Sequence, residues 1–211
     1  YDIDKFIEIV CMCHDFGKAT TYFQDYLDGK YNGREKQHGI ISALFTYYIL
    51  PDKYKHLGFL IVKKHHGNID NGNDECKKDE VMWKFNKQIE DMKRNNIDKL
   101  NIIYKDYLGD RTIEDFFEWI SDDDNLKSIK REFIQNKYTV EELFLCEYVY
   151  SLLLTADKSQ LILKEAFIPS KPYPSDFIKS YKDNLVKDTL DKNPKLDDSL
   201  VFNMRNQIYD D

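Results

Sequence analysis

The N-terminal part of the chain predicts helices from the spacing of its apolar residues. A stripe of residues three and four apart leads directly into His14 and Asp15; its members are Ile3, Phe6, Ile7, Val10 and Cys13. Gly17 follows as a stop signal for this first helix. A second short helix is expected over residues 21–27, and the polar stretch 30–36 predicts a loop.

The next two helices carry histidines at their ends. One apolar helical face contains His38, Ile41, Ser42, Phe45 and Ile49, and Pro51 then closes that helix. Another helix is expected from about residue 52 towards His65, with Gly67 at its end. Residues 68–78 hold glycines and several charges, which is typical of a loop.

The second half of the chain is helical and strongly charged in its pattern. Residues 80–136 show N-cap signals at Thr112 and at the Asp run after Ser121. Thr139-Val-Glu-Glu is a capping box that opens the most hydrophobic helix, which we expect to be buried and to end near Asp157. A proline-rich connector (169–174) and two weaker helical stretches (175–191 and 197–209) follow. With no strand-like alternation of useful length, the pattern predicts an all-α protein.

Length, composition and charge narrow the class of protein. The 211 residues suit a single domain, with a core over about residues 1–168 and C-terminal helices over 169–211. No apolar run approaches the roughly 18 residues of a membrane span, so we expect a soluble protein with no membrane partner. The four cysteines form no C-x-x-C pair, which favours reduced thiols in the cytoplasm. The net charge of −7 counts against a free-standing nucleic-acid binder, although bound cations would offset it locally.

The histidines are few and unusually placed. Only five occur, and four of them lie at predicted helix ends or on a core-facing stripe: His14, His38, His65 and His66. Taken singly, each has an ordinary structural role, such as a hydrogen-bonded core histidine or an imidazole at a helix C-terminus. Adjacent residues also point about 100° apart on a helix, so His14 and Asp15 converge only where the helix ends.

Taken together, these residues favour a metal centre. Divalent transition metals prefer imidazole nitrogen with carboxylate oxygen, and four imidazoles with Asp15 and Asp157 suffice for two ions. One aspartate at a helix end would bridge such a pair, with histidines divided on either side. Two ions roughly 3.5–4 Å apart suit hydrolysis of a phosphodiester without an activated side-chain nucleophile.

The chain resembles the CRISPR-associated type I HD nuclease at four elements, in the same order. His14-Asp15-Phe16-Gly17-Lys18-Ala19, followed by Phe23-Gln24, looks like the family's His-Asp-x-Gly-Lys-Ala/Ser-x-x-x-Phe-Gln signature. His38-Gly-Ile-Ile-Ser42-Ala is similar to the family's His-x-x-x-Ser-Ala helix, and His65-His66-Gly67 to its His-His-Gly element. Thr155-Ala156-Asp157-Lys158-Ser159 resembles its late Asp-x-x-Ser segment. The resemblance covers about residues 5–160, and its first element is the most specific.

This resemblance implies an HD-domain helical bundle with a histidine/aspartate metal centre in its core. Asp15 would bridge two divalent ions, with His14 and Asp157 on one and His38, His65 and His66 on the other. The ions would be Mn²⁺, Ni²⁺, Co²⁺ or Fe²⁺, with Mg²⁺ as a further option. The implied activity is metal-dependent cleavage of single-stranded DNA in type I CRISPR interference. The implied partners are a helicase domain or subunit and an RNA-guided targeting complex.

Other residues have secondary roles in this interpretation. Lys18 would contact the scissile phosphate, and Ser42 either supports a ligand or packs as a small residue. The lysine pairs at 63–64 and 77–78 flank the His-His-Gly element and either guide a strand or form an ordinary solvated surface. His56 matches no motif and is expected at the surface.

One departure and two rival functions stay open. The family pattern places another metal-binding histidine well upstream, whereas none of the 13 residues before His14 is histidine. If the chain starts at Tyr1, the His14/Asp157 ion should therefore bind weakly. The rivals are an HD phosphohydrolase of small nucleotides and a degenerate, non-catalytic HD docking domain. No nucleoside-triphosphate-binding loop occurs, because Met12 replaces its first glycine and Ala19 follows Lys18.

Overall fold

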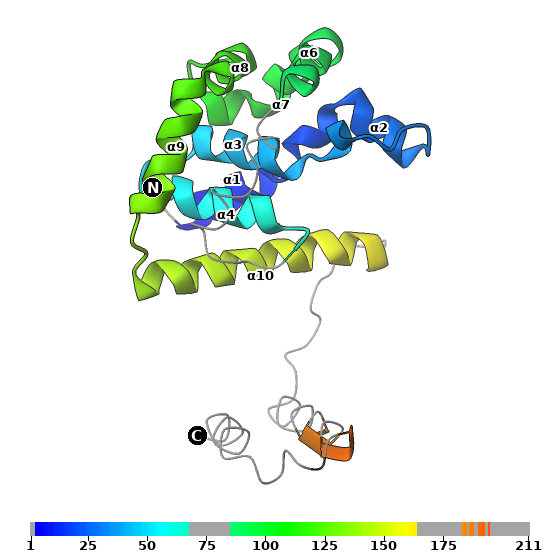
Figure 1. Ribbon diagram of the computed structural model, residues 1–211, viewed down its shortest axis with the longest axis vertical. Coiled ribbons are helices and arrows are strands. Elements are labelled where there is room, and N and C mark those ends of the chain that lie inside the picture. Colours follow the sequence, from blue (N-terminus) through cyan, green and yellow to red (C-terminus); the bar gives the residue numbers. More distant parts are fainter. Residues whose placement is uncertain are drawn as a thin grey trace. The chain divides into compact units, whose positions relative to one another are not determined.

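The computed structural model describes residues 3–67 and 85–163, together with a few residues between 183 and 194. Every regular element in these segments is helical, which confirms the all-α prediction (Figure 1). The elements are α1 (Ile3–Cys13), η1 (Phe16–Ala19), α2 (Thr21–Leu27), η2 (Arg34–Lys36), α3 (Gly39–Ile49), α4 (Lys55–Lys64), α6 (Asn86–Asn95), α7 (Ile97–Leu108), α8 (Ile113–Ser121), α9 (Asp123–Gln135) and α10 (Val140–Leu163). The chain divides into two compact units, residues 1–164 and 165–211.

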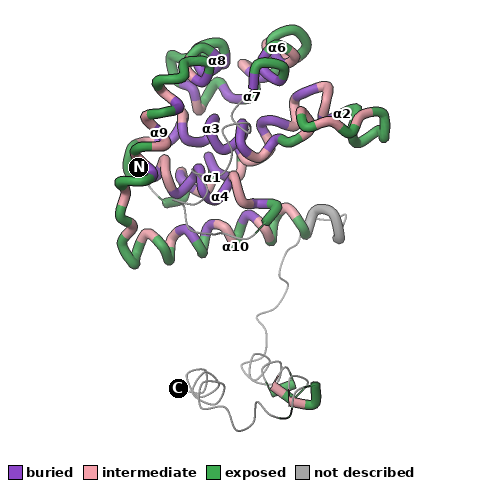
Figure 2. Tube along the Cα trace, viewed as in Figure 1, coloured by how far each residue is buried: buried purple, intermediate pink, exposed green. Residues whose placement is uncertain are grey.

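The core is centred on α3 and α4, in which most residues are buried, and α1 packs against both (Figure 2). Within α3 every residue is buried except Gly39 and Tyr48, which are half-buried. Phe16, just after α1, stacks on Phe45 with ring centroids 4.0 Å apart. This aromatic contact fixes the chain that follows His14 and Asp15 against the central helix.

Helices α6 to α9 cover one side of this core, and α10 passes along the other beside α1 and α4 (Figure 1). The cap signals are confirmed at three helix starts. Thr112 and Asp115 form a reciprocal capping box on α8, and Asp122 accepts a hydrogen bond from the backbone N–H of Asp124 on α9. Thr139 and Glu142 bond reciprocally at the start of α10.

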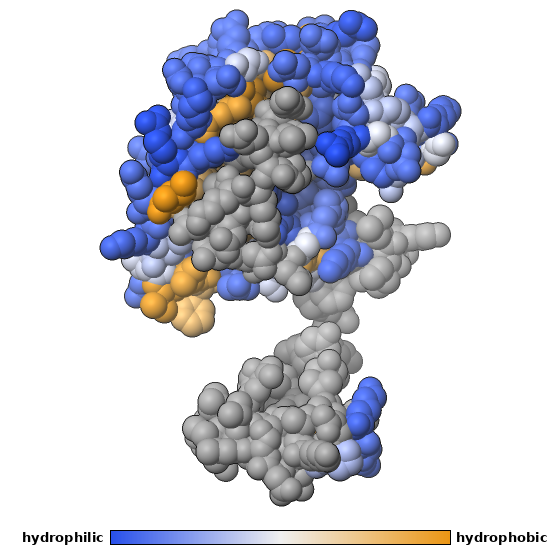
Figure 3. Space-filling model, viewed as in Figure 1, coloured by the Kyte–Doolittle hydropathy of each residue, from blue (hydrophilic) through white to orange (hydrophobic). Residues whose placement is uncertain are grey.

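Helix α10 differs from the expectation in length and in burial. It continues to Leu163, because no glycine or proline interrupts the sequence near Asp157. Over residues 140–158, whose burial the structure describes, only one face is buried, through Cys146, Val149 and Leu153 at three- and four-residue spacing. Leu143, Phe144, Tyr148 and Leu152 are exposed, and apolar residues form separate patches on the otherwise hydrophilic face in Figure 3. The expectation of a buried helix was therefore wrong.

Three smaller expectations also change. Helix α1 ends at Cys13, before Gly17, which lies in the short helix η1. His56 is not a surface residue: its side chain is only 15% exposed and packs edge-on against Phe133. Residues 34–36 of the expected loop form η2.

The loop expected at 68–78, the connector at 169–174 and the stretch 197–209 lie outside the described residues, as does most of 175–191. Within the described part, no helix combines the length and apolar character that a membrane crossing requires.

Candidate metal centre

The predicted ligand residues converge from four separate segments of the first unit. His14 and Asp15 follow α1, His38 caps the start of α3, and His65 and His66 follow α4. Asp157 comes from α10. They form two groups, in each of which one ligand atom per residue lies within 4.8 Å of the others: His38 with His65 and His66, and His14 with Asp15 and Asp157.

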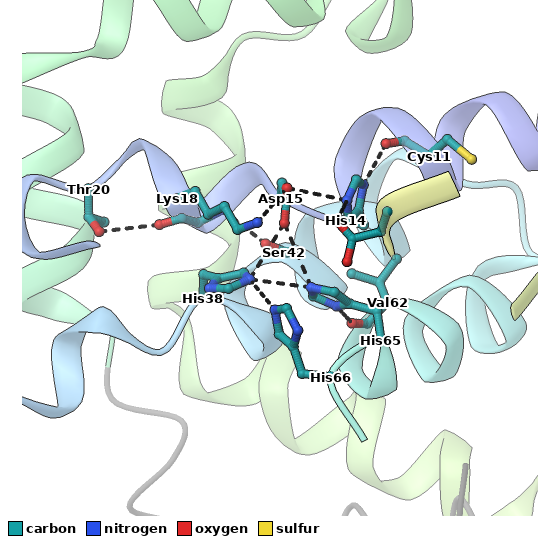
Figure 4. A network of polar contacts seen from close by, with 12 residues as sticks. Cys11, His14, Asp15, Lys18, Thr20, His38, Ser42, Val62, His65 and His66 are labelled. Atoms are coloured by element: carbon teal, nitrogen blue, oxygen red, sulfur yellow. Dashed lines mark hydrogen bonds and ion pairs between the residues drawn. The ribbon is translucent and has the colours of Figure 1, made fainter. Parts of the chain in front are cut away.

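The first group is a cluster of three imidazoles whose Nε2 atoms face one another (Figure 4). His38 Nε2 lies 3.3 Å from His65 Nε2 and 2.9 Å from His66 Nε2. A hydrogen bond between two ring nitrogens needs a proton on one of them, and one proton serves only one such contact. The three facing nitrogens therefore cannot all be satisfied by hydrogen bonds to one another. With the proton of each neutral ring on Nδ1, the same arrangement would present three Nε2 lone pairs to one cation.

Backbone carbonyls orient two of the imidazoles. His65 donates from Nδ1 to the carbonyl of Val62, and His14 donates from Nδ1 to the carbonyl of Cys11 at 2.7 Å. Because a carbonyl only accepts, the proton of each neutral ring is on Nδ1, which leaves a lone pair on Nε2. Histidine ligands to metals are commonly fixed in this way, through their second ring nitrogen.

Asp15 lies between the two groups (Figure 4). Its Oδ1 is 3.5 Å from His38 Nε2 and 3.7 Å from His65 Nε2, whereas its Oδ2 is 3.3 Å from His14 Nε2. Oδ1 is buried, and no described residue donates a hydrogen bond to it. A buried carboxylate oxygen without a donor is costly, and a cation beside it would remove that cost.

The electrostatics favour the neutral form of the three imidazoles in the first group. Burial, reinforced by repulsion from His65 and His66, lowers the pKa of His38 to about 3. Burial likewise lowers the pKa of His65 to about 4. Burial also lowers the pKa of His66, with a contribution from Lys18. All three rings are therefore neutral at pH 7, as metal ligation by imidazole requires.

Asp15 and His14 shift towards their charged forms. Burial raises the pKa of Asp15, but hydrogen bonds and charge from His14 and Lys18 outweigh it and hold that pKa well below its usual range. Burial lowers the pKa of His14, yet its contacts with Asp15, the Cys11 carbonyl and Asp157 raise it overall. Asp15 is thus a carboxylate at any pH near neutrality.

The turn after Asp15 is positioned by close packing against α3. Ser42 Oγ accepts a hydrogen bond from the backbone N–H of Gly17 at 2.9 Å, so Ser42 supports the turn rather than only filling space. A Cβ on Gly17 would lie 2.5 Å from Ile41 Cγ2 and 2.9 Å from the carbonyl oxygen of His38. Glycine is required here for close approach, and this approach brings Asp15 beside His38.

The remaining predicted residues lie at the edge of the cluster. Lys18 Nζ bonds Asp15 Oδ2 at 2.7 Å, and the lysine is partly exposed. Asp157 Oδ1 is 4.0 Å from His14 Nε2.

Tyr150 has a role that the sequence pattern did not reveal. Its hydroxyl donates to the carbonyls of Lys64 and Gly67, and so holds the His-His-Gly turn against α10. A tyrosine on an apolar helix gives no signal of such a contact in sequence alone.

The donors present in these groups suit divalent metal ions. The first group supplies three imidazole nitrogens with Asp15 Oδ1 nearby, and the second supplies one imidazole and two carboxylates. Nitrogen-rich ligation suits transition ions, whereas a mixed set with two carboxylates also accepts Mg²⁺ or Mn²⁺.

The helical bundle with a His-Asp pair among its helices is consistent with an HD-type domain. Three curated proteins match the chain. A "CRISPR-associated endonuclease Cas3-HD" of Pyrococcus furiosus is 34% identical over 73 residues, which cover 32% of this chain and 31% of the relative. A "CRISPR-associated nuclease/helicase Cas3" of Haloferax volcanii is 38% identical over 69 residues, covering 29% of this chain and 7% of the relative.

The third relative gives the longest match. A "CRISPR-associated endonuclease Cas3-HD" of Methanocaldococcus jannaschii is 31% identical over 127 residues, which cover 56% of this chain and 45% of the relative. The chain thus spans less than half the length of each of these relatives. No family model and no solved structure matches. Fold, site and relatives together support an HD nuclease domain of Cas3 type.

Substituting Gly17 should disturb both packing and site. We expect Gly17→Ala to lower the free energy of unfolding by about 1–3 kcal/mol, because the new Cβ meets the His38 backbone. Urea denaturation measures this change. Gly39→Ala is the matched control, since its Cβ would meet nothing closer than 3.5 Å. Equal stability of the two variants would contradict the close-approach argument.

The buried imidazoles should make the metal-free protein sensitive to acid. Because the pKa of His38 is about 3 when folded and about 6.5 when unfolded, only the unfolded chain takes up that proton between these values. Stability is therefore full above pH 6.5 and falls as the pH falls, by up to about 1.4 kcal/mol per pH unit for each such proton.

We expect the His38→Gln variant to lose less stability than the unaltered protein between pH 7 and pH 5. Thermal unfolding in a chelator measures both slopes, and their difference isolates His38 from His14, whose raised pKa acts in the opposite direction. Parallel slopes would show that His38 is not buried as a neutral ring.

Proposed function

We propose that this chain is a metal-dependent nuclease that hydrolyses phosphodiester bonds of single-stranded DNA through a two-metal site. The observation that carries the proposal is Asp15 Oδ1, a buried carboxylate oxygen with no donor among the described residues, facing the Nε2 atoms of His38 and His65. The names of the three relatives support nuclease chemistry in a CRISPR system.

Each residue has a part in this proposal. His38, His65 and His66 would hold one ion, His14 and Asp157 the other, and Asp15 would be shared by both. Divalent ions bound there supply Lewis acidity for attack on phosphorus. Lys18, whose ammonium lies 2.7 Å from Asp15 Oδ2, is placed to attract the scissile phosphate and hold it beside the cluster.

We further propose that the domain works in the cytoplasm with a helicase, in type I CRISPR interference directed by an RNA-guided complex. The Haloferax relative is named a nuclease/helicase, which supports a helicase as domain or subunit. A helicase would deliver the unpaired strand. It would also lessen the need for a strongly basic surface on a chain with net charge −7.

Cleavage is tested with circular single-stranded DNA and Mn²⁺. We expect cutting of the circle by the unaltered protein and a loss of at least about 100-fold in Asp15→Ala, because that substitution removes the shared ligand. Asp124→Ala, which removes an exposed carboxylate on α9, is the control and should cut normally.

Two other results would contradict the proposed nuclease function. Hydrolysis of mononucleotides but not of DNA would indicate a small-nucleotide phosphohydrolase. No hydrolysis of any phosphate ester would indicate a docking domain.

Metal binding gives a test that does not depend on cleavage. We expect isothermal titration with Mn²⁺ to show two sites of unequal affinity, the tighter one lost in His38→Ala and the weaker one in Asp157→Asn. The inequality follows from three imidazoles in one group and one in the other. Two equally tight sites, or the same loss in both variants, would contradict the division of ligands.

A further inference from the structure

An open pocket of about 580 Å³ lies directly beside the three-imidazole cluster. His38 and His66 form part of its wall, and so do four lysines and two aromatic residues. We call these six residues the lysine pocket: Lys18, Lys36, Lys63, Lys64, Phe23 and Tyr26. They come from η1, α2, η2 and the end of α4.

The charge of this pocket is opposite to that of the whole chain. Acidic residues outnumber Lys and Arg by 38 to 31, yet the described residues that line the pocket include four lysines, of which Lys18 is paired with Asp15, and no carboxylate. A concave surface lined by one sign of charge concentrates its field on ligands of the opposite sign. The pocket therefore favours a polyanion, even though the average charge of the protein repels one.

Contacts join the pocket to the metal centre. Lys18 belongs to both, since its ammonium bonds Asp15 and also lies 5.5 Å from the ring centroid of Phe23. Phe23 packs edge-on against His38, with centroids 4.9 Å apart. A phosphate beside Lys18 would therefore be adjacent to the imidazole cluster. The nucleotides next to that phosphate would then lie in the pocket.

The far side of the pocket carries an aromatic residue paired with a lysine. Tyr26 is 41% exposed, and the ammonium of Lys36 lies 3.8 Å from its ring centroid. Gln88 of α6 fixes the Lys36 segment by donating 2.9 Å hydrogen bonds to the carbonyls of Glu35 and Gln37. Asp91, also on α6, accepts 2.6 Å bonds from the backbone and hydroxyl of Thr21 at the start of α2. Both walls are thus held in place without a ligand.

We propose that the lysine pocket holds the part of a DNA single strand next to the scissile phosphate, with the backbone on Lys36, Lys63 and Lys64 and a base against Tyr26. This inference rests on the proposed nuclease function. Unpaired bases have free faces for stacking on an aromatic ring, whereas the bases of a duplex are already stacked. The lysines would contact only phosphate groups, which are the same at every nucleotide, so the pocket should have little sequence preference.

Binding of fluorescent oligo-dT, measured by anisotropy in EDTA, tests the pocket without any cleavage. We expect Lys36→Glu to weaken binding at least about fivefold and to flatten its salt dependence by about one phosphate contact. Lys127→Glu makes the same charge change at an exposed lysine of α9 and should bind within about twofold of the unaltered protein.

Stacking is tested with Tyr26→Ala and the conservative Tyr26→Phe. We expect Tyr26→Ala to weaken binding of oligo-dT, Tyr26→Phe to restore it, and both variants to bind an abasic strand equally well, because stacking requires a base. A merely structural role for Tyr26 would weaken binding of both strands alike.

The outcomes separate this inference from the proposed function. Hydrolysis of bis(p-nitrophenyl) phosphate with Mn²⁺ by the unaltered protein tests the chemistry alone, so its absence would remove the proposed function while the binding pattern above still supported the pocket. Equal binding by Lys36→Glu and Lys127→Glu, no measurable binding of oligo-dT, or displacement of the strand by stoichiometric dTMP would each overturn the pocket as a strand site.

Discussion

The position of the Asp15 carboxylate is the constraint on which the rest of the site depends. It lies within 4 Å of three imidazoles and one ammonium, just after the end of α1. Gly17 lets the turn after Asp15 pack closely against α3, because it has no side chain. Ser42 holds the same turn by accepting a hydrogen bond from the backbone N–H of Gly17. The bundle around them acts as a rigid frame, because the Phe16–Phe45 stack joins the same turn to the most buried helix.

Much of this arrangement was predictable because short-range patterns have direct physical meaning. Apolar spacing predicted α1, α2, α3 and α4 to within a few residues, and capping residues predicted the starts of α8, α9 and α10. Histidines placed where helices end were expected to meet, and the fold brings them together. The metal ions that these residues would hold stay a prediction.

The parts that the pattern did not reveal all depend on contacts between distant segments. Nothing near Tyr150 in sequence indicates that its hydroxyl meets the carbonyls of Lys64 and Gly67, more than 80 residues away. His56 was expected at the surface because it matches no motif, but the approach of α9 covers it with Phe133. Helix α10 was expected to be buried because it is apolar. A helix at the surface of a bundle turns only one face to the core, and its other faces stay exposed unless another surface covers them.

Helix α10 carries both Asp157 and Tyr150, about two turns apart along one stiff rod. One end of this span, at Asp157, reaches His14 in the second group. The other end, at Tyr150, supports the backbone that presents His65 and His66 in the first group. The two halves of the cluster therefore share a mechanical link that does not pass through Asp15. A small shift of α10 along its axis would therefore move Asp157 and Tyr150 together, and would change the geometry of both ligand groups at the same time.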